Sequence, residues 1–322
     1  MIITLGETMS IRDLKGKDML CLADYTPEQV QFLINLGLEL KIRYYTGERI
    51  LNTLSGKSIA MIFEKPSTRT RVSLEVAAYQ LGAQPITLGW NELQLGRGEP
   101  IKDTARVLSR FVNGITARVK NHGDLIELAN YASVPVINAL SDLSHPMQVI
   151  ADYMTIYEKK NRLKGIKLAF IGDGSDNMVN SLMVVASQLG VDFYLGSPSS
   201  LKPNENVFKK ALEFSQISGS KIIFTEDPYE AVDSADVVYT DVFVSMGQED
   251  IAEQKKKILK PYQVNIKLIE KAKNKAIFLH CLPAHRGEEV TDEVIEGPWS
   301  AVWDEAENRL HSEKAVLSAL IP

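Results

Sequence analysis

Short apolar runs that alternate with helical patterns along the whole chain are the feature that most restricts its fold. The runs are rich in β-branched and apolar residues, and helical periodicity follows them. This alternation is typical of parallel sheets that are covered by helices on both faces. The expected strands are 58–63, 85–88, 114–119, 135–138, 167–171, 191–195, 221–225, 237–240 and 276–280. The predicted fold class is therefore α/β, with two doubly wound domains and parallel sheets, joined by interdomain helices.

The length of the chain favours two domains over one. With 322 residues and 45% hydrophobic content, it can bury two cores. Val149, Tyr153 and Ile156 share one face of an expected helix that begins in HPMQVIADYM and bridges the two halves. The predicted divisions are a first domain over 1–147, a second over 148–306, and a C-terminal helix over 307–322 that packs back on the first domain.

Composition excludes several classes of protein. The net charge of -5 provides no basic field for nucleic acid. The amino-terminal MIITLGETMS lacks a signal-like pattern, and no run approaches the roughly 18 apolar residues of a membrane span. Cys21 and Cys281 form no disulfide framework and have no metal-like spacing. We expect a cytoplasmic protein with no membrane or nucleic-acid partner, no metal and no cofactor.

The segment PSTRTR, residues 66–71, follows the first expected strand and places two arginines at the start of a helix. Unpaired N–H groups and the helix dipole already make that end positive, so Arg69 and Arg71 would each cost roughly a few tenths of a kcal/mol there. A bound phosphate would reverse the sign, because hydroxyl, N–H and guanidinium groups all donate to its oxygens. The alternative is a Ser/Thr-capped helix with a solvated arginine face. The GxxxxGK[ST] pattern of a nucleotide P-loop is missing.

Other polar residues fall where later strands of the first half end, which is where open parallel sheets bind ligands. Arg118 ends the strand in GITAR, and His145 and Gln148 lie at the start of the bridging helix. The imidazole and the amide could donate to a carbonyl oxygen. A histidine before proline also commonly caps a helix, and a strand-end arginine commonly forms a salt bridge.

The second half repeats this arrangement. IGDGSDN resembles a dinucleotide-binding turn but has Asn177 where a glycine belongs, which disfavours a nicotinamide site. The Asn177 amide could instead hold a carboxylate or an amino group. In TDVFVSMG, Asp241 suits a substrate ammonium ion, or else caps the next element, and a loop with Ser245 and Met246 follows.

FLHCLPAHRG is the most unusual stretch of the chain. Cys281, after the last expected strand, could be a nucleophile, a polar group at the site, or an inert buried thiol. A nucleophilic role requires a lowered thiol pKa and a general base such as His280 or His285 beside it.

Together, PSTRTR, SHPMQ, DVFVSMG and HCLPAHRG resemble the ornithine carbamoyltransferases in order and spacing along nearly the whole chain. SMG and HCLP mark the ornithine branch, whereas aspartate carbamoyltransferases typically have HPLP. Phe243 stands where many members carry Trp, and an aromatic ring is retained. The resemblance implies a carbamoyl phosphate-binding domain over 1–147 and an ornithine-binding domain over 148–306. The implied reaction converts carbamoyl phosphate and L-ornithine to L-citrulline and phosphate.

The resemblance also implies roles for particular residues. Carbamoyl phosphate would be bound by Ser67, Thr68, Arg69, Thr70, Gln94, Arg118, His145, Gln148, Cys281, Leu282 and Arg309. Ornithine would be bound by Asn177, Asp241, Ser245 and Met246. The catalytic residues would be Arg118, His145 and Cys281. The family forms trimers in which a loop of one subunit, here with Gln94, completes the neighbouring site, so we expect a homotrimer or a multiple of trimers.

Three alternatives stay open at this point. A sibling transferase would use putrescine or N-acetylornithine, but putrescine has neither the carboxylate nor the α-amine that Asn177 and Asp241 would bind. A non-catalytic two-domain binder of periplasmic type would need an export signal. An oxidoreductase is disfavoured by the interrupted glycine pattern.

Overall fold

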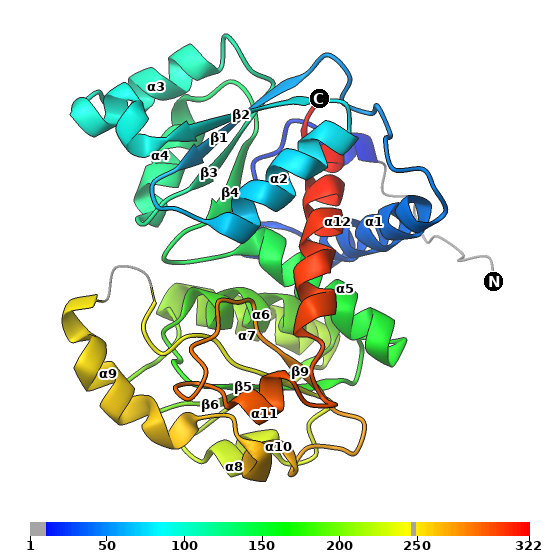
Figure 1. Cartoon of the computed structure of the whole chain (residues 1–322), viewed down its shortest axis with the longest axis vertical. Helices are drawn as coiled ribbons and strands as arrows, with labels where there is room; N and C mark the ends of the chain where they lie inside the picture. Colours follow the sequence, from blue (N-terminus) through cyan, green and yellow to red (C-terminus); the bar gives the residue numbers. More distant parts are fainter. Residues whose placement is uncertain (1–10, 246–248) are drawn as a thin grey trace.

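Two parallel sheets form the framework of the molecule, one in each half of the chain (Figure 1). The computed structural model describes residues 11–245 and 249–322. Sheet A has the strand order β2-β1-β3-β4 and sheet B the order β7-β6-β5-β8-β9. The strands are β1 (Ser58–Phe63), β2 (Gln84–Gly89), β3 (Gly114–Arg118), β4 (Val136–Leu140), β5 (Lys167–Ile171), β6 (Asp192–Gly196), β7 (Ile222–Thr225), β8 (Val237–Tyr239) and β9 (Ile277–Leu279). The pairings between these strands are parallel, which confirms the predicted α/β class with two parallel-sheet domains.

Helices cover both faces of each sheet, and the strands are apolar on both sides for that reason. In β1, Ile59 and Met61 face a core shared with helices α1, α2, α5 and α12. Ala60 and Ile62 alternate with them and face a second core beneath α3 and α4. The near-continuous apolar runs of the sequence follow from this burial on two faces.

Twelve α-helices and six 3-10 helices are assigned within the described residues. The α-helices are α1 (Pro27–Tyr45), α2 (Thr68–Gln80), α3 (Ile101–Leu108), α4 (His122–Tyr131), α5 (Pro146–Lys160), α6 (Asn177–Leu189), α7 (Glu205–Ser218), α8 (Pro228–Val232), α9 (Ala252–Leu259), α10 (Ile266–Ile269), α11 (Asp292–Ile295) and α12 (Val302–Leu320). The 3-10 helices are η1 (Ile11–Leu14), η2 (Leu22–Asp24), η3 (Trp90–Glu92), η4 (Gln94–Arg97), η5 (Glu249–Ile251) and η6 (Lys260–Tyr262). Among the helices described, none combines the length and apolarity required to cross a membrane.

The strand order reverses once in each sheet, and these two points position the site. Sheet A winds outward in both directions from β1 and β3, and sheet B from β5 and β8. Ligands of open parallel sheets bind beyond the carboxyl ends of the strands at such a switch point. The segments that follow these four strands begin at Glu64, Val119, Gly172 and Thr240, and they include most of the residues singled out from the sequence.

Helices α5 and α12 connect the two domains (Figure 1). α12 runs from the second domain back along the first, where it packs against α1, α2 and α5. It begins at Val302, five residues before the predicted segment 307–322. Asp304 and Glu305 lie in its first turn, where negative charge suits the positive end of the helix dipole. The sequence pattern missed this turn because Asp304 and Glu305 interrupt its apolar spacing. The exact domain boundaries remain a prediction.

We predict that Leu317→Ala destabilises the protein by about 2–5 kcal/mol, because the side chain is fully buried between α12 and the first domain. Urea unfolding followed by circular dichroism measures the change. Ile217→Ala, at a position that is 82% exposed, is the control and should shift stability by less than about 0.5 kcal/mol. Equal midpoints for the two variants would contradict the packing of α12 described above.

Candidate active site

The start of α2 presents an open set of hydrogen-bond donors. Ser67 is the N-cap residue in an extended conformation, and its hydroxyl makes no capping hydrogen bond in the described part of the chain. A simple serine-capped helix is therefore not what the structure contains. Ser67 and Thr68 line a cavity of about 490 Å³, whose opposite wall is the segment from Gly89 to Glu92. Such a helix end is suited to an anion.

The two arginines of this helix turn lie in different surroundings. Arg71 is 58% exposed and forms an ion pair with Glu75 at 3.1 Å. Burial lowers the pKa of Arg69, and the positive charge of Arg309 lowers it further. Arg69, which is the less exposed of the two, therefore carries the charge that an anion would stabilise.

Arg118 and Arg309 meet at the second hydroxyl of α2. Thr70 Oγ1 accepts from Arg309 at 2.9 Å and from Arg118 at 3.3 Å. Burial lowers the pKa of Arg118 to about 10, and the charges of Arg309 and Arg69 act in the same direction. The Nε atoms of Arg118 and Arg309 are buried without a hydrogen-bond partner among the described residues. Unsatisfied buried donors are costly, so this cluster suits a further anion beside Glu313, which already pairs with Arg309 at 2.9 Å.

His145 adds a neutral donor or acceptor beside this cluster. It is the N-cap residue of α5 and is 3% exposed. Burial, together with the charges of Arg309, Arg118 and Arg69, holds the pKa of His145 well below its usual range. Its backbone N–H donates to Ser181 at 2.9 Å, and its Nδ1 lacks a partner among the described residues. A neutral imidazole in this position can polarise a carbonyl group without adding charge.

Gln148, one turn along α5, orients Arg309. Its amide oxygen accepts from Arg309 at 3.0 Å. Its amide nitrogen donates to Asp152 at 2.7 Å and lies 3.2 Å from Glu305. The predicted hydrogen bond from this amide to a substrate carbonyl therefore competes with two buried carboxyl groups.

A second cavity, of about 270 Å³, lies between the two domains. It joins Arg118 from the first domain to residues of the second. The predicted site residues that line it are Arg118, Asn177, Asp241, Ser245, Cys281 and Leu282. The sequence thus predicts site residues in four separate segments, and the fold brings these residues together at this cavity.

The wall formed by the second domain is acidic. Asp241 is 8% exposed and accepts from its neighbour Val242 at 2.8 Å. Burial raises the pKa of Asp241, and burial together with Asp241 and Asp173 raises the pKa of Asp176 well above its usual value. Ser245 donates to Asp176. Two carboxyl groups that are costly to ionise would be stabilised by a bound ammonium ion.

The sequence pattern indicates Asn177 but does not identify Asp176, which precedes it in the same turn. Asp176 caps α6 through a 2.7 Å bond from Met178, and N-capping is the role that an Asp at this position ordinarily indicates. The Asn177 amide donates to the backbone oxygen of Ser141 at 2.7 Å, which links the two domains.

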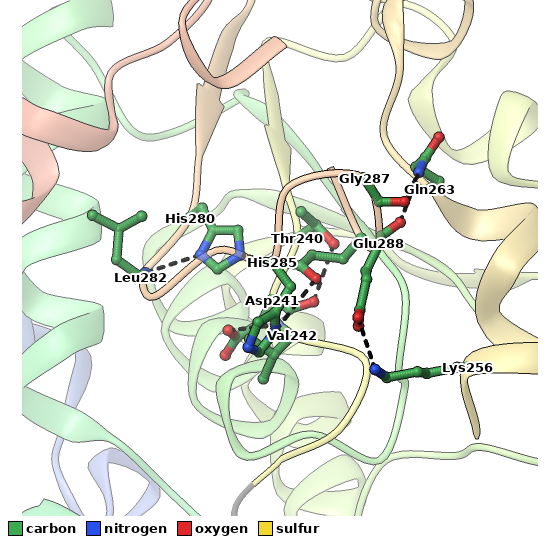
Figure 2. Close-up of polar contacts among 11 residues, drawn as sticks. Thr240, Asp241, Val242, Lys256, Gln263, His280, Leu282, His285, Gly287 and Glu288 are labelled. Carbon is green, nitrogen blue, oxygen red and sulfur yellow. Dashed lines mark hydrogen bonds and ion pairs between the residues drawn. The ribbon is translucent and has the colours of Figure 1, made fainter. Parts of the chain in front are cut away.

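A chain of hydrogen bonds fixes the 280–283 loop after β9, and Figure 2 shows part of it. Leu282 N–H donates to His280 Nδ1 at 2.9 Å, so this ring nitrogen is an acceptor. His280 Nε2 lies 3.1 Å from the fully buried carboxylate of Glu289. Leu282 has a φ of 58°, a left-handed conformation that is unfavourable for a branched side chain. The His280 contact holds the backbone of Leu282 in this conformation at the edge of the cavity.

Cys281 is a protonated thiol in these surroundings. Burial raises its pKa well above the usual value of 9.0, and the negative charges of Asp241 and Glu305 raise it further. Its hydrogen bond to Asp241 is that of a thiol donating to a carboxylate. Of the three roles left open by the sequence, this geometry favours a polar group at the site over a nucleophile.

Eight predicted residues that the structure describes do not line the interdomain cavity: Ser67, Thr68, Arg69, Thr70, Gln94, His145, Gln148 and Arg309. Gln94 is exposed on η4 and lines neither of the two cavities described above. Met246 lies outside the described residues. Their proposed roles stay predictions.

Two groups of side chains place possible metal ligands within 4.8 Å of one another. These are Asp241, His280 and Cys281, and His285, Glu288 and Glu289. Both ring nitrogens of His280 already take part in hydrogen bonds. Glu288 is paired with Lys256 at 2.7 Å, as Figure 2 shows. These contacts engage His280 and Glu288, whereas Glu289 Oε2 is buried without a hydrogen-bond partner among the described residues, and the absence of a metal remains a prediction.

The fold and the cavity define a two-domain α/β enzyme whose small-molecule site lies between the carboxyl edges of two parallel sheets. Residues 17–158 match the family described as aspartate/ornithine carbamoyltransferase, carbamoyl-P binding domain, and residues 164–320 match the Asp/Orn binding domain of the same family. The chain therefore belongs to the aspartate/ornithine carbamoyltransferase family.

Individual relatives agree with this family. An ornithine carbamoyltransferase of Hyperthermus butylicus is 58% identical over 308 residues, which cover 96% of this chain and 98% of that protein. The solved ornithine carbamoyltransferase of Pyrococcus furiosus has a TM-score of 0.92 at 52% identity, with 96% of this chain and 98% of that one covered. That of Thermus thermophilus has a TM-score of 0.85 at 39% identity, with coverage of 98% and 100%.

We predict that iodoacetamide labels Cys281 slowly at pH 7 and progressively faster above pH 9. A raised pKa leaves less than about one thiol in a hundred ionised at pH 7, and the thiolate is the reactive form. Mass spectrometry of the Cys281 peptide measures the rate, with glutathione in the same tube as the reference. Labelling at pH 7 as fast as that of glutathione would show that the thiol is activated.

Proposed function

We propose that this chain transfers the carbamoyl group of carbamoyl phosphate to the δ-amine of L-ornithine, giving L-citrulline and phosphate. One observation carries the proposal: Arg118, whose pKa is lowered by burial and by the charges of Arg309 and Arg69, forms a cationic wall of the interdomain cavity, and the buried Asp176 and Asp241 form an acidic wall. The cationic wall suits a phosphate, and the acidic wall suits a diamino acid. The chain's relatives named ornithine carbamoyltransferase support the same assignment.

Carbamoyl phosphate is assigned to the cationic wall. Its phosphate would accept from Ser67, Thr68, Arg69 and Thr70 at the N-terminus of α2, which the helix dipole favours. The remaining contacts would come from Arg118, His145, Gln148, Arg309, Cys281 and the backbone of Leu282, with Gln94 supplied by a neighbouring subunit.

Ornithine is assigned to the acidic wall. Asp241 would bind the α-ammonium group, Asn177 would hold the carboxylate, and Ser245 and Met246 would also bind ornithine. Asp176 lies next to Ser245 and adds negative charge beside the ammonium group.

The reaction needs charge stabilisation rather than a covalent intermediate. The lone pair of the δ-amine attacks the carbonyl carbon, and the bond from that carbon to the phosphate oxygen breaks. Arg118 and neutral His145 stabilise the developing oxyanion, while Arg69 stabilises the departing phosphate. The proton lost by the amine ends on phosphate, so the products are citrulline and hydrogen phosphate.

The amine must lose its charge before it attacks. With a lysine-like pKa near 10.4, only about one amine in a thousand is neutral at pH 7. Desolvation between the two domains favours the neutral amine, and so do the nearby guanidinium groups. Protonated Cys281 is bonded to Asp241 and does not serve as the base in this arrangement.

We also propose that the protein works in the cytoplasm as a homotrimer or a multiple of trimers. Gln94 supports this arrangement because it is exposed on η4 rather than buried in its own subunit. A biosynthetic role in arginine formation is supported by the relative from Pyrococcus furiosus, which is named the anabolic ornithine carbamoyltransferase and is 52% identical over 308 residues.

An assay that measures the carbamoylated product from each of three amines tests the function, and ornithine is the amine that gives citrulline. We expect turnover with L-ornithine and carbamoyl phosphate, and at least about 100-fold lower kcat/KM with putrescine, because Asn177 and Asp241 would be left without their ionic partners. N-acetylornithine should fail similarly, since acetylation removes the α-ammonium charge. Preference for either of these amines would assign the chain to the sibling transferases instead.

We predict that two substitutions each impair the use of a different substrate. Arg69→Ala should lower kcat/KM for carbamoyl phosphate by roughly 100- to 1,000-fold, because an anion contact that strengthens in the transition state is lost. Asp241→Asn should chiefly raise the KM for ornithine, by about 10-fold or more. Steady-state kinetics with each substrate varied in turn separate the effects. Arg106→Ala, an exposed arginine paired with Asp103, is the control. Unchanged carbamoyl phosphate kinetics in the Arg69 variant would contradict the assignment.

A further inference from the structure

Two carboxyl groups that no substrate role accounts for lie buried together where the domains join. Asp152 belongs to α5 and Glu305 to the first turn of α12, and both side chains are 0% exposed. α5 and α12 are the helices that connect the domains. Buried acids are rare unless they are paired and hydrogen bonded, so this pair requires a physical explanation.

On one side the pair holds a residue of the proposed carbamoyl phosphate site. Gln148 donates to Asp152 at 2.7 Å and lies 3.2 Å from Glu305 Oε1. The other end of the same amide accepts from Arg309 at 3.0 Å. The orientation of the Gln148 amide, and through it that of the Arg309 guanidinium, is therefore fixed by the two acids.

On the other side the pair holds the base of the 280–283 loop. Glu305 Oε2 accepts from the backbone N–H of His280 at 2.9 Å. Tyr239, at the end of β8, lies within hydrogen-bond distance of both acids, at 3.1 Å from Glu305 and 3.3 Å from Asp152. Glu305 thus contacts α5, β8 and the segment that carries Cys281 and Leu282.

The pair is arranged to keep one proton. Burial raises the pKa of Asp152 to about 7 and raises that of Glu305 well above its usual value, and Glu305 donates a hydrogen bond to Asp152. Two adjacent carboxylates cannot both ionise in such a site. The nearby cation Arg309 favours the single negative charge that remains. One shared proton supplies the donor that joins the two helices.

We propose that Glu305 is a positioning residue for carbamoyl transfer, which acts with Asp152 to hold Gln148 and the backbone of His280 in one arrangement. The two substrate sites are then built on a common support, and displacement of Glu305 disturbs both. The inference rests on the proposed function, because its readout is citrulline formation. The simpler reading is that the pair only stabilises the fold.

Three single variants of the full chain distinguish these readings. Glu305→Gln keeps an acceptor for His280 N–H and a donor for Asp152, whereas Glu305→Ala removes both. Asp304→Ala is the matched control, since it truncates an acid one position earlier on the same helix that is 44% exposed and paired with Lys159. Kinetics with carbamoyl phosphate and ornithine varied separately are measured per folded protein, with folding checked by circular dichroism.

We expect Glu305→Gln to stay within about 5-fold of the wild type in kcat/KM for both substrates. Glu305→Ala should lose at least about 10-fold in kcat and raise both KM values, because Gln148 and the 280–283 loop lose a common contact. Asp304→Ala should match the wild type. A purely structural pair would lower the yield or the melting temperature of Glu305→Ala while leaving kcat and both KM values unchanged, and that result would overturn the proposal.

A further variant, Asp152→Asn, tests the proposal if Glu305→Ala does not fold. Asp152→Asn retains an acceptor for Gln148 and a donor for Glu305, so it should also stay within about 5-fold. If Asp152→Asn and Glu305→Gln fold normally but each loses more than about 10-fold, hydrogen-bond geometry is not what the pair contributes, and the proposal is wrong. Absence of citrulline formation by the wild type would reject the proposed function itself. Normal wild-type turnover with an unaffected Glu305→Ala would reject only the positioning role.

Discussion

The repulsion among three clustered guanidinium groups, one buried and two half-buried, is the constraint on which the rest of this structure depends. Arg69, Arg118 and Arg309 come from α2, β3 and α12, and their charges lower the pKa values of Arg118 and of neighbouring His145. Glu313, which is paired with Arg309 at 2.9 Å, offsets part of this charge, but burial and mutual repulsion still act in the same direction on Arg118. The remaining framework has to hold the three side chains together, and it does so through the carboxyl edge of sheet A and the C-terminal helix.

α12 has a larger role than closing the first domain. Its first turn carries Glu305, and its second carries Arg309, so one rigid helix reaches both the 280–283 loop and the start of α2. Residues four apart lie on the same face of a helix. The spacing between the two contacts is therefore fixed by helix geometry. A movement of α12 would disturb both the contact with the 280–283 loop and the contact with the start of α2.

Much of the framework and part of the site were predictable from sequence for a physical reason. Strands buried on two faces must be apolar throughout, so β1 and β5 appear in the sequence with the bounds that the structure has. A helix that begins with PSTRTR after such a strand predicts an anion site. The i,i+4 spacing of Arg71 and Glu75 was visible in the sequence, but the lowered pKa of Arg69 depends on its burial and on distant Arg309. Nor could the sequence pattern reveal Asp152 and Glu305, since a charged residue within a helix ordinarily faces solvent.

The opposite charges of the two walls bear directly on the chemistry. An ammonium ion attracted by Asp176 and Asp241 arrives charged, and a charged amine has no lone pair with which to attack. Arg118 lines the same cavity as both acids and disfavours a second positive charge at the reacting end. The acidic wall can thus keep the α-ammonium group ionised while the cationic wall favours loss of the proton from the δ-amine. One molecule with two amines would then be bound by one and would react through the other.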